Sequence, residues 1–510
     1  MDDMVEDGGT GAARLRFLLD SNVFIAVEPY SGELEQNLEL GVRLLRLANE
    51  QRHLLCVAPA TRDDLLEGKD AARRRQRLAE LGKFHLLAEA PVTADLRERA
   101  GDSGPGTNDE RDLRLLAELD SGAVTYLVTD DARLRRRAAR AGLGDRTLSL
   151  PDAVTLLAGF EPTELTPPPR VSTVPCYSLN PEDKIFDGLR SDYPEFDDWF
   201  AKVRQEIETR RCFVIEEEGA YAAVALLKLE DDCEYAIEEP VVKISTFKVS
   251  EDHSGVKYGE LLLKAILHSL TTTNSASLYV EVLPSHPEVL DFLAAFGFLD
   301  QGYRSVRGEY VVTKSLRPPA EETDRSDLDH HVLFGPPALL ARQRIFAVPI
   351  KPRWHDQLFP EQAPPQQSAQ LALFGSAETQ THPWGNAIRK AYLCNAATNQ
   401  VVAGDVLLFY QSEDQTFSAV GIVEDVLRSS EAVEVMQFVG RRTVYTGSEI
   451  TEMARRARGV LAIRFRQDRF LEPPITLADM QLAGALRSWP QSITSLRPQG
   501  MAWMRDLLVG

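Results

Sequence analysis

Short apolar runs alternate with longer helical stretches along the first third of the chain. The runs have the length of buried strands, and the stretches between them carry apolar residues three or four positions apart, which predicts helices. Strands that alternate with helices indicate a parallel sheet covered by helices. The predicted strands are 14–19, 53–58, 84–87, 123–128 and 147–150, and the predicted helices are 34–51, 60–66, 70–81, 110–119, 132–141 and 151–158.

The middle third has a mixed pattern, which predicts an α+β domain. Three extended stretches precede a glycine-containing turn and a helix, and two further strands flank a second helix. The predicted strands are 211–216, 219–228, 240–249, 277–283 and 308–314, and the predicted helices are 260–269 and 287–295.

The last third alternates apolar and polar residues over many short segments and shows little helical spacing. Such a pattern is typical of a small β-barrel. The predicted strands are 345–349, 390–395, 405–410, 419–426, 433–438 and 460–467.

Proline-rich and polar segments separate these three patterns and predict a multidomain α/β protein. The length of 510 residues agrees with about three domains. The predicted organisation is a disordered tail at 1–13, a parallel-sheet domain at 14–160, a proline-rich linker at 161–175, a mixed α+β domain at 176–317, a linker at 318–342 and a β-barrel at 343–510.

Composition and charge narrow the functional classes. No apolar run approaches the ~20 residues that a membrane-spanning helix needs, and residues 1–13 lack the features of a secretory signal. Five cysteines without a Cys-x-x-Cys pair predict reduced thiols and a cytoplasmic protein. The formal net charge of −20 argues against a general nucleic-acid binder. It leaves open RNA binding by one face of an end domain, because arginines cluster at 73–75 and 135–137.

Four aspartates of the first third fall where a parallel sheet would bring them together. Asp20 ends the first strand and Asp131 follows the fourth, whereas Asp64 and Asp112 lie on intervening helices. Clustered carboxylates repel one another unless a divalent cation neutralises them, and oxygen ligands suit Mg²⁺ or Mn²⁺. Such an ion activates water for phosphodiester hydrolysis. The alternative is a set of helix caps and turn residues, and Asp109 competes with Asp112 for the third position.

These segments resemble the PIN domains, a family of metal-dependent ribonucleases that includes many toxins of toxin–antitoxin pairs. The resemblance lies in Leu18-Leu-Asp20-Ser-Asn22-Val, in Pro59-Ala-Thr-Arg-Asp-Asp64-Leu-Leu and in Val128-Thr-Asp130-Asp131-Ala-Arg-Leu, and it covers residues 14–160. It implies RNA as a partner, such as tRNA or another structured RNA, and it allows a homodimer. The implied catalytic metal ligands are Asp20, Asp64, Asp112 and Asp131, with Asn22 and Thr129 orienting the first and the last. The family often has Glu as its second acid, for which this chain offers Asp63, Asp64 and Glu67.

A glycine-spaced turn follows the strand at 240–249 and opens a helix. The segment Ser254-Gly-Val-Lys-Tyr-Gly259 would present backbone N–H groups and a helix N-terminus to an anion such as pyrophosphate. An ordinary tight turn is the alternative. The strand and helix that follow, and then Phe296-Gly-Phe298, favour the anion-binding interpretation.

This order of elements resembles the GNAT acetyltransferases over residues 178–316. The resemblance implies acetyl-CoA as a cofactor, with a main-chain contribution from the preceding strand. The implied cofactor-binding residues are Phe247, Val249, Ser254, Gly255, Val256, Lys257, Tyr258 and Gly259. Leu293 stands where many members have a catalytic tyrosine, and Ser285 or His286 stands where an asparagine is frequent. His286 is therefore a candidate acid or base, with helix capping as the alternative.

Basic and aromatic side chains alternate on strands of the last third, as in Ala462-Ile-Arg-Phe-Arg466. Such strands can stack bases and contact phosphates, and a half-buried sheet with solvated arginines is the alternative. The segment Gly404-Asp-Val-Leu-Leu-Phe-Tyr410, followed by Gly421-Ile-Val-Glu424, resembles the PUA-like barrels of the ASCH and EVE types over residues 343–475. This resemblance implies RNA or modified-base recognition. The pocket candidates are Trp384, Asn386, Arg389 and Lys390.

Three functions are compatible with these features. In the first, the PIN-like domain cuts RNA, the barrel selects it, and the GNAT-like domain modifies RNA, an aminoacyl group or a protein, in a toxin-like role. In the second, the chain is mainly an acetyltransferase whose other domains are docking modules. In the third, it is a non-enzymatic regulator. The carboxylate set favours the first function, and the missing tyrosine counts against the second.

Overall fold

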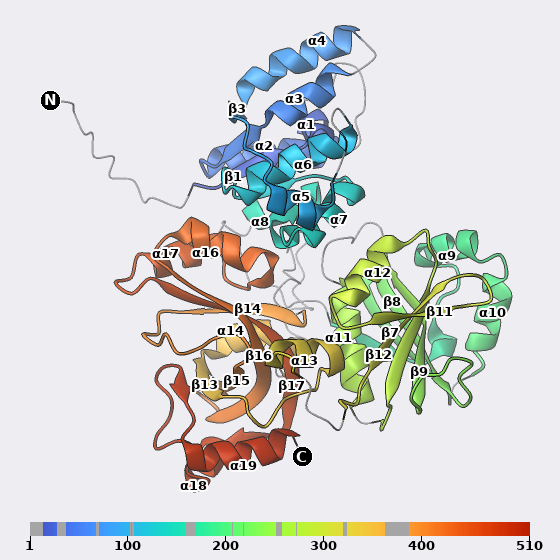
Figure 1. Cartoon of the computed structure of the whole chain (residues 1–510), viewed down its shortest axis with the longest axis vertical. Helices are drawn as coiled ribbons and strands as arrows, with labels where there is room; N and C mark the ends of the chain where they lie inside the picture. The colour runs from blue at the N-terminus through green and yellow to red at the C-terminus, as the bar shows by residue number, and fades with distance from the viewer. Residues whose placement is uncertain are drawn as a thin grey trace. The chain divides into compact units, whose positions relative to one another are not determined.

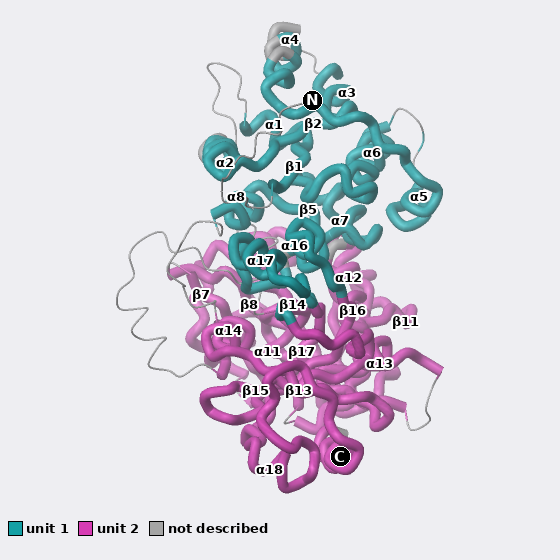
Figure 2. The backbone as a smooth tube through the Cα atoms, turned by 90° about the vertical axis from the view of Figure 1, so that its left-hand side faces the viewer, with its two compact units in different colours: residues 1–164, 393–395, 427–462 teal, residues 165–392, 396–426, 463–510 magenta. Residues whose placement is uncertain are grey.

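The structure is a computed structural model that describes residues 14–27, 37–67, 71–102, 104, 107–158, 170–206, 208–217, 219–250, 258–271, 273–319, 324–362 and 387–509. The chain divides into two compact units, which Figure 2 shows in different colours. Unit 1 contains residues 1–164, 393–395 and 427–462, and unit 2 contains residues 165–392, 396–426 and 463–510.

Unit 1 is built on a five-stranded sheet in the order β3-β2-β1-β4-β5. Every neighbouring pair is parallel, as the alternation of strands and helices predicted. Strands β1 and β4 are adjacent at its centre, and the side chains from Phe17 to Leu19 and from Tyr126 to Val128 are almost fully buried. The strands are β1 (Arg16–Leu19), β2 (Leu54–Val57), β3 (His85–Leu86), β4 (Tyr126–Val128) and β5 (Thr147–Leu148).

Helices of the N-terminal domain pack together in two groups (Figure 1). Helix α2 contacts α1 and α8, and α6 contacts α3 and α5. Helix α6 buries Leu113, Leu116 and Ala117, whose spacing gives one apolar face, and the Thr107 side chain caps its first turn. The helices are α1 (Ser21–Val27), α2 (Leu38–Glu50), α3 (Pro59–Leu66), α4 (Ala71–Glu80), α5 (Ala94–Ala100), α6 (Asn108–Asp120), α7 (Ala132–Arg140) and α8 (Leu150–Ala158).

Two helices from late in the sequence complete unit 1, α16 (Ala432–Val439) and α17 (Gly447–Ala454). The prediction of a strand at 433–438 is therefore wrong. A short apolar run does not separate helix from strand by its pattern, and here Val435 and Val439, four positions apart, are buried on one helical face. The Tyr126 hydroxyl on β4 donates to the Met436 carbonyl at 3.2 Å, which fastens α16 to the N-terminal domain.

The first sheet of unit 2 has seven strands in the order β11-β12-β10-β9-β8-β7-β6. Strands β9 and β10 are parallel, and the other neighbouring pairs are antiparallel. The strands are β6 (Ser172–Val174), β7 (Arg210–Glu217), β8 (Ala220–Glu230), β9 (Val241–Val249), β10 (Ser277–Val282), β11 (Leu299–Arg304) and β12 (Tyr310–Ser315). The helices are α9 (Asp187–Asp192), α10 (Phe196–Val203), α11 (Tyr258–Leu270), α12 (Pro287–Ala294) and α13 (Asp327–Phe334).

Two apolar clusters pack on this seven-stranded sheet. In one, Leu262 and Ile266 of α11 pack with Val242 of β9. In the other, Phe200 of α10 packs with Leu226 of β8. Alternate side chains of a strand point to opposite faces, so the two clusters cover the two faces of the sheet.

Cys176 and Cys212 form a disulfide in the second cluster, with their Cα atoms 5.6 Å apart. The prediction that the thiols are reduced is therefore wrong for this pair. Thirty-six positions separate the two cysteines, and only the antiparallel pairing of β6 with β7 brings them together, with Val174 opposite Cys212. Cys56, Cys233 and Cys394 are free thiols.

The predicted linker at 318–342 contains helix α13 (Asp327–Phe334), so this prediction is also wrong. The ammonium group of the fully buried Lys314 donates to the carbonyls of Phe296, Val332 and Leu333 at 2.9, 2.9 and 3.0 Å. A buried ammonium needs three acceptors, and α13 supplies two of them. Local composition could not show this, because Lys314 lies on a strand that precedes the segment.

The C-terminal strands form an open six-stranded sheet in the order β14-β17-β16-β15-β13-β18. In the described part of the chain the edge strands β14 and β18 are not neighbours, so the predicted closed barrel is not formed. The strands are β13 (Ile345–Ile350), β14 (Arg389–Cys394), β15 (Val406–Gln411), β16 (Thr416–Ser429), β17 (Val460–Thr476) and β18 (Thr494–Ser495), with helices α14 (Pro352–Leu358), α18 (Leu477–Leu482) and α19 (Pro498–Val509). Among the described residues, no helix is both long and apolar enough to cross a membrane.

Candidate functional site

Asp20 and Asp131 follow the two central strands of the N-terminal sheet, at the same edge. The Thr129 hydroxyl donates to the Asp20 carboxylate at 2.7 Å, and the Asn22 amide donates to the same oxygen at 2.9 Å. The Asp131 N–H in turn donates to the Thr129 hydroxyl at 3.0 Å. Parallel pairing of β1 with β4 therefore brings these four polar residues together, as expected for strand ends in an α/β sheet.

The carboxylates at this edge influence one another. Burial raises the pKa of Asp20 above its ordinary value, and the charges of Asp131 and Asp64 raise it further. Burial also raises the pKa of Asp112 to about 6, with Asp131 and Asp20 adding to the effect. The four aspartates named from the sequence are thus close enough to interact, although they come from four separate segments.

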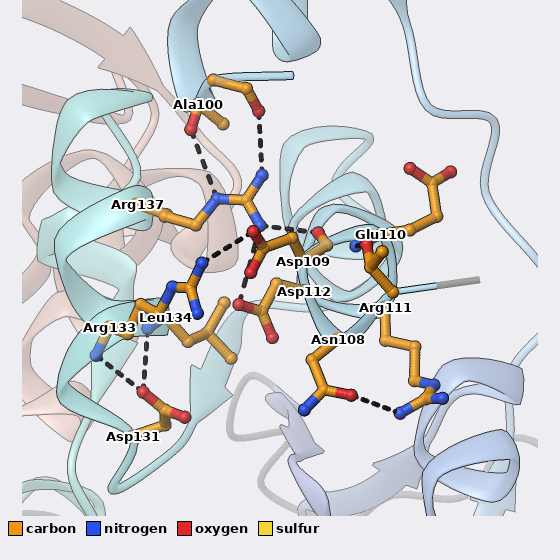
Figure 3. Close-up of polar contacts among 12 residues, drawn as sticks. Ala100, Asn108, Asp109, Glu110, Arg111, Asp112, Asp131, Arg133, Leu134 and Arg137 are labelled. Atoms are coloured by element: carbon orange, nitrogen blue, oxygen red, sulfur yellow. Dashed lines mark hydrogen bonds and ion pairs between the residues drawn. The ribbon is translucent and has the colours of Figure 1, made fainter. Parts of the chain in front are cut away.

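Arginines from the neighbouring helices pair with two of these acids, and Figure 3 shows Arg137 beside Asp112. Arg111 contacts Asp64 at 3.1 Å, and Arg137 lies 3.6 Å from Asp112. The Arg137 guanidinium is buried and also donates to the carbonyls of Ala100, Gly101 and Asp109, at 3.3, 2.8 and 2.6 Å. Two of the four aspartates, Asp64 and Asp112, therefore have arginines of the same domain as partners.

Asp131 caps helix α7, because its carboxylate accepts from the N–H groups of Arg133 and Leu134 at 2.6 and 3.1 Å. The capping alternative thus describes the local geometry of this residue. Within the described residues, no three His, Cys, Asp or Glu side chains are arranged so that they could hold a metal ion. As they stand, the four aspartates do not fit a Mg²⁺ or Mn²⁺ site.

Strand β9 of unit 2 carries a bulge at Ser245. Ile244 pairs with Leu227 and Thr246 pairs with Leu226, so that Ser245 has no opposite residue on β8. On the other side of β9, pairing with β10 ends where Ile244 meets Val280, although both strands continue. Beyond this point no described strand covers that edge of β9, whose main-chain groups can bind an extended ligand.

Helix α11 begins beside this open edge. Residues 251–257 lie outside the described part of the chain, and with them Ser254, Gly255, Val256 and Lys257. Tyr258 is buried and its hydroxyl donates to the Glu217 carboxylate. Gly259 faces two aromatic rings, because a Cβ there would lie 3.5 Å from Phe292 and 3.6 Å from Phe247. A helix N-terminus next to an unpaired strand edge is an arrangement that suits an anionic, extended cofactor.

A cavity of about 290 Å³ lies next to the bulge and contains charged and aromatic side chains. Its floor comes from strands β7 to β10, one wall from α9, α10 and their connection, and the other from the segment between β11 and β12. The lining residues are Leu189, Tyr193, Glu195, Phe196, Trp199, Arg210, Lys228, Glu230, Lys243, Ile244, Ser245, Thr246, Glu281, Arg307 and Glu309.

Carboxylates in this cavity are held by specific partners. Glu281 on β10 accepts from the Lys243 ammonium at 2.6 Å and from the Tyr235 hydroxyl at 2.9 Å. Glu309 accepts from the Tyr193 hydroxyl at 2.7 Å. Burial and this contact with Glu309 raise the pKa of Tyr193 above its ordinary value. None of these residues was singled out by the sequence patterns. The aromatic spacing in Phe196-Asp-Asp-Trp199 was the one available signal.

His286 lies at the start of helix α12 and is not among the cavity-lining residues. Its Nε2 atom lies 3.1 Å from an Asp192 carboxylate oxygen, and both side chains are about one-third exposed. The side chain of Leu293 is buried in the apolar core, so it offers no proton. A catalytic role for His286 stays a prediction.

The candidates of the C-terminal sheet are paired, buried or outside the described residues. Trp384 and Asn386 belong to the undescribed part. Arg389 pairs with Glu424 at 2.7 Å. Lys390 is fully buried, burial lowers its pKa well below the ordinary value, and its ammonium donates to the Leu358 carbonyl. The prediction that Lys390 contacts RNA is therefore wrong, because a side chain enclosed by protein cannot contact a phosphate.

Comparison with known families assigns the central domain. A model of the Acetyltransferase (GNAT) family matches residues 174–298, which confirms the predicted acetyltransferase domain, and acetyl-CoA fits a domain of this family. A comparison with curated proteins found no match. The resemblance of residues 14–160 to PIN domains stays a prediction.

Several solved structures are similar to parts of the chain. An acetyltransferase of the GNAT family from Staphylococcus aureus Mu50 is 12% identical, with 29% of this chain and 99% of that chain covered and a TM-score of 0.22. PaiA N-acetyltransferase from Thermoplasma acidophilum, in complex with coenzyme A, is 11% identical, with coverages of 25% and 79% and a TM-score of 0.21. ASCH from Zymomonas mobilis is 12% identical, with coverages of 32% and 94% and a TM-score of 0.23.

Proposed function

We propose that this chain is an N-acetyltransferase that transfers the acetyl group of acetyl-CoA to an amine held in the cavity beside Ser245. The observation that carries the proposal is the position of the cavity. It adjoins both the bulge of β9 and the point where β9 and β10 separate, within the segment that matches the acetyltransferase family. A donor on the open edge of β9 and an acceptor in the cavity would thus meet at one place.

The residues present suit acetyl-CoA. The main chain of Phe247 and Val249 lies on the uncovered edge of β9, and Tyr258 and Gly259 form the first turn of α11. These groups would hold the pantetheine arm and the phosphates respectively, because both offer backbone N–H donors. When bound, acetyl-CoA supplies the acetyl group as a thioester.

Glu281 is positioned to take the proton of the acceptor amine. It lies one residue beyond the last β9–β10 pair and lines the cavity. Its carboxylate accepts hydrogen bonds from the Lys243 ammonium and from the Tyr235 hydroxyl. Orientation by two donors also fixes the carboxylate toward one site, as general-base catalysis requires.

The experiment is an assay of CoA thiol release from acetyl-CoA with a panel of primary amines, together with calorimetry of acetyl-CoA binding. For Glu281→Gln we expect transfer to fall at least about 10²-fold, with unchanged acetyl-CoA binding. Glu182→Gln, at an exposed position of the same domain, is the matched control and should behave as wild type. Full activity of Glu281→Gln would exclude this residue as the base, and a wild type that binds no acetyl-CoA would overturn the proposal.

A second candidate function is RNA cleavage at the carboxylate edge of the N-terminal sheet. It is favoured by the effect of neighbouring carboxylates, which raise the pKa values of Asp20 and Asp112, because such a group gains from a nearby cation. Since the aspartates do not fit a metal site as they stand, no catalytic step follows from them. Titration of Mn²⁺ by calorimetry, with Asp20→Asn beside the wild type, tests this candidate. Binding that Asp20→Asn abolishes would support it, and equal heats would reject it.

A further inference from the structure

Three cations lie side by side on the floor of the acceptor cavity. Arg210 on β7 is directly opposite Lys228 on β8, and Lys228 is directly opposite Lys243 on β9. Residues directly opposite on antiparallel strands point to the same face of a sheet, and all three line the cavity. Like charges directly opposite destabilise a sheet. A row of three positive charges is therefore expected to have anions beside it.

Each of the three cations forms an ion pair with one carboxylate of the protein. Glu206 lies 2.6 Å from Arg210, Glu230 lies 3.0 Å from Lys228, and Glu281 lies 2.6 Å from Lys243. The pairs differ in exposure, since the Arg210 side chain is 6% exposed and the Lys228 side chain is 38% exposed. Each pair leaves some N–H groups of its cation available to a ligand, because an ammonium has three donors and a guanidinium has five.

The walls of the cavity restrict the shape of the ligand. Phe196 and Trp199 of α10 provide aromatic surface. The Cζ atom of Arg210 lies over the Trp199 ring, 5.7 Å from its centroid. Arg307 and Glu195 form an ion pair at 2.9 Å between the two walls. A volume of about 290 Å³ is at the lower end for ligand pockets, so it suits a small molecule and not a folded protein.

We infer that the acceptor is a small amine that also carries an anionic group, a carboxylate or a phosphate, which lies on the row of Arg210, Lys228 and Lys243. This inference rests on the proposed acetyl transfer, and it names the substrate class. A polyamine would place a second positive charge against the row, and a ligand without an amine would bring no positive charge to the carboxylates of Glu281 and Glu309. A molecule with both charges matches both sets of side chains.

Matched pairs of acceptors test the inference in the full-length protein. Phenylalanine is compared with phenethylamine, which lacks the carboxylate, and phosphoethanolamine is compared with ethanolamine, which lacks the phosphate. The first pair tests a carboxylate and the second a phosphate. We expect kcat/KM to be at least about tenfold higher for the anionic member of one pair, because a charged group on a buried cation contributes strongly. Equal or better use of the neutral member in both pairs would overturn the inference.

Variants on the row separate binding from chemistry. For Lys228→Gln we expect the KM of the preferred anionic amine to rise about tenfold at unchanged kcat. The kcat/KM of the matched neutral amine should not change. Lys202→Gln, at an exposed position of α10, is the matched control. A merely structural lysine would change both amines alike, and this result would also overturn the inference.

Failure of acetyl transfer is distinguishable from failure of this inference. If no amine releases CoA, calorimetry of the same four amines is performed in the presence of CoA. Selective binding of an anionic member, lost in Lys228→Gln, would support the inferred ligand class and would contradict the proposed acetyl transfer. Binding without such selectivity, or no binding of any amine, would reject the inference.

Discussion

The carboxylate edge of the N-terminal sheet and the cavity of the acetyltransferase domain both gather acids and bases, but they use them differently. At the edge, arginines pair with Asp64 and Asp112, and Arg137 binds three carbonyls as well as lying 3.6 Å from Asp112. In the cavity, ion pairs such as Lys243–Glu281 surround an open volume. A charge cluster thus indicates a ligand site only when the fold leaves space beside it.

This difference implies different consequences for substitutions. Charges that fill a site should contribute chiefly to stability, because their removal leaves buried polar groups without partners. Charges around an open volume should contribute chiefly to binding, because water and ligand replace one another there. Substitutions that are matched in chemistry can test whether the two regions behave in these two ways.

The largest effect is expected for Arg137→Met. Its side chain is 5% exposed, and the change would leave three carbonyls and Asp112 without their cation. We expect the free energy of unfolding of unit 1 to fall by about 3–5 kcal/mol. Hydrogen exchange of the β1 and β4 amides, measured by mass spectrometry, reports this unit separately. Arg140→Met, at an exposed position of the same helix, is the control, and equal exchange in both variants would contradict the comparison.

A smaller effect of opposite sign is expected for Asp112→Asn. Burial raises the pKa of Asp112 to about 6 from an ordinary 3.8. Between these values the folded protein binds a proton that the unfolded chain has lost, so stability falls as the pH rises through this window. We expect Asp112→Asn to remove this fall and to stabilise unit 1 at neutral pH by about 1–2 kcal/mol.

Urea unfolding of this variant and of the wild type, at pH values below and above the window, measures the difference. Asp95→Asn, at an exposed position of α5, is the control. A carboxylate that were needed for the fold would give the reverse result, with Asp112→Asn less stable at neutral pH.

The smallest effect is expected for Arg307→Gln at the rim of the cavity. Its ion pair with Glu195 joins side chains that are 50% and 66% exposed, so the free energy of unfolding should change by less than about 0.5 kcal/mol. Acceptor binding should weaken in a salt-dependent manner, because rim charges act over distance. Arg111→Gln, whose side chain is 12% exposed at the carboxylate edge, should cost more stability. A larger loss of stability in Arg307→Gln than in Arg111→Gln would contradict the comparison.

Periodic segments were predictable because their apolar residues must face a core. The parallel N-terminal sheet, helix α6 and the order of elements from β9 to α12 all follow from such patterns. The pattern failed at 433–438, where α16 replaces a strand, and at 324–342, where α13 replaces a linker. In both places the partner surface comes from a distant part of the sequence, so the local pattern carried little information.

The candidate site divides in the same way. Asp20 and Asp131 were predictable because both follow parallel strands, whereas the arginine partners of Asp64 and Asp112 depend on the packing of helices α6 and α7. The cavity was not predictable, because its lining comes from several strands, two helices and a connection. Lys390 was named as a pocket candidate but is fully buried, since a lysine in sequence does not show whether a fold encloses it.

By itself, the sequence determined the parallel-sheet domain and the acetyltransferase domain of this protein, since periodicity and glycine spacing depend on neighbouring residues. It also determined which residue types are available for chemistry. Only the tertiary structure decided which of them meet. The Arg442–Asp145 pair at 2.7 Å and the row of Arg210, Lys228 and Lys243 both join distant segments. The physical reason is that charge pairing and cavity formation depend on distances in space, which strand register and helix packing set.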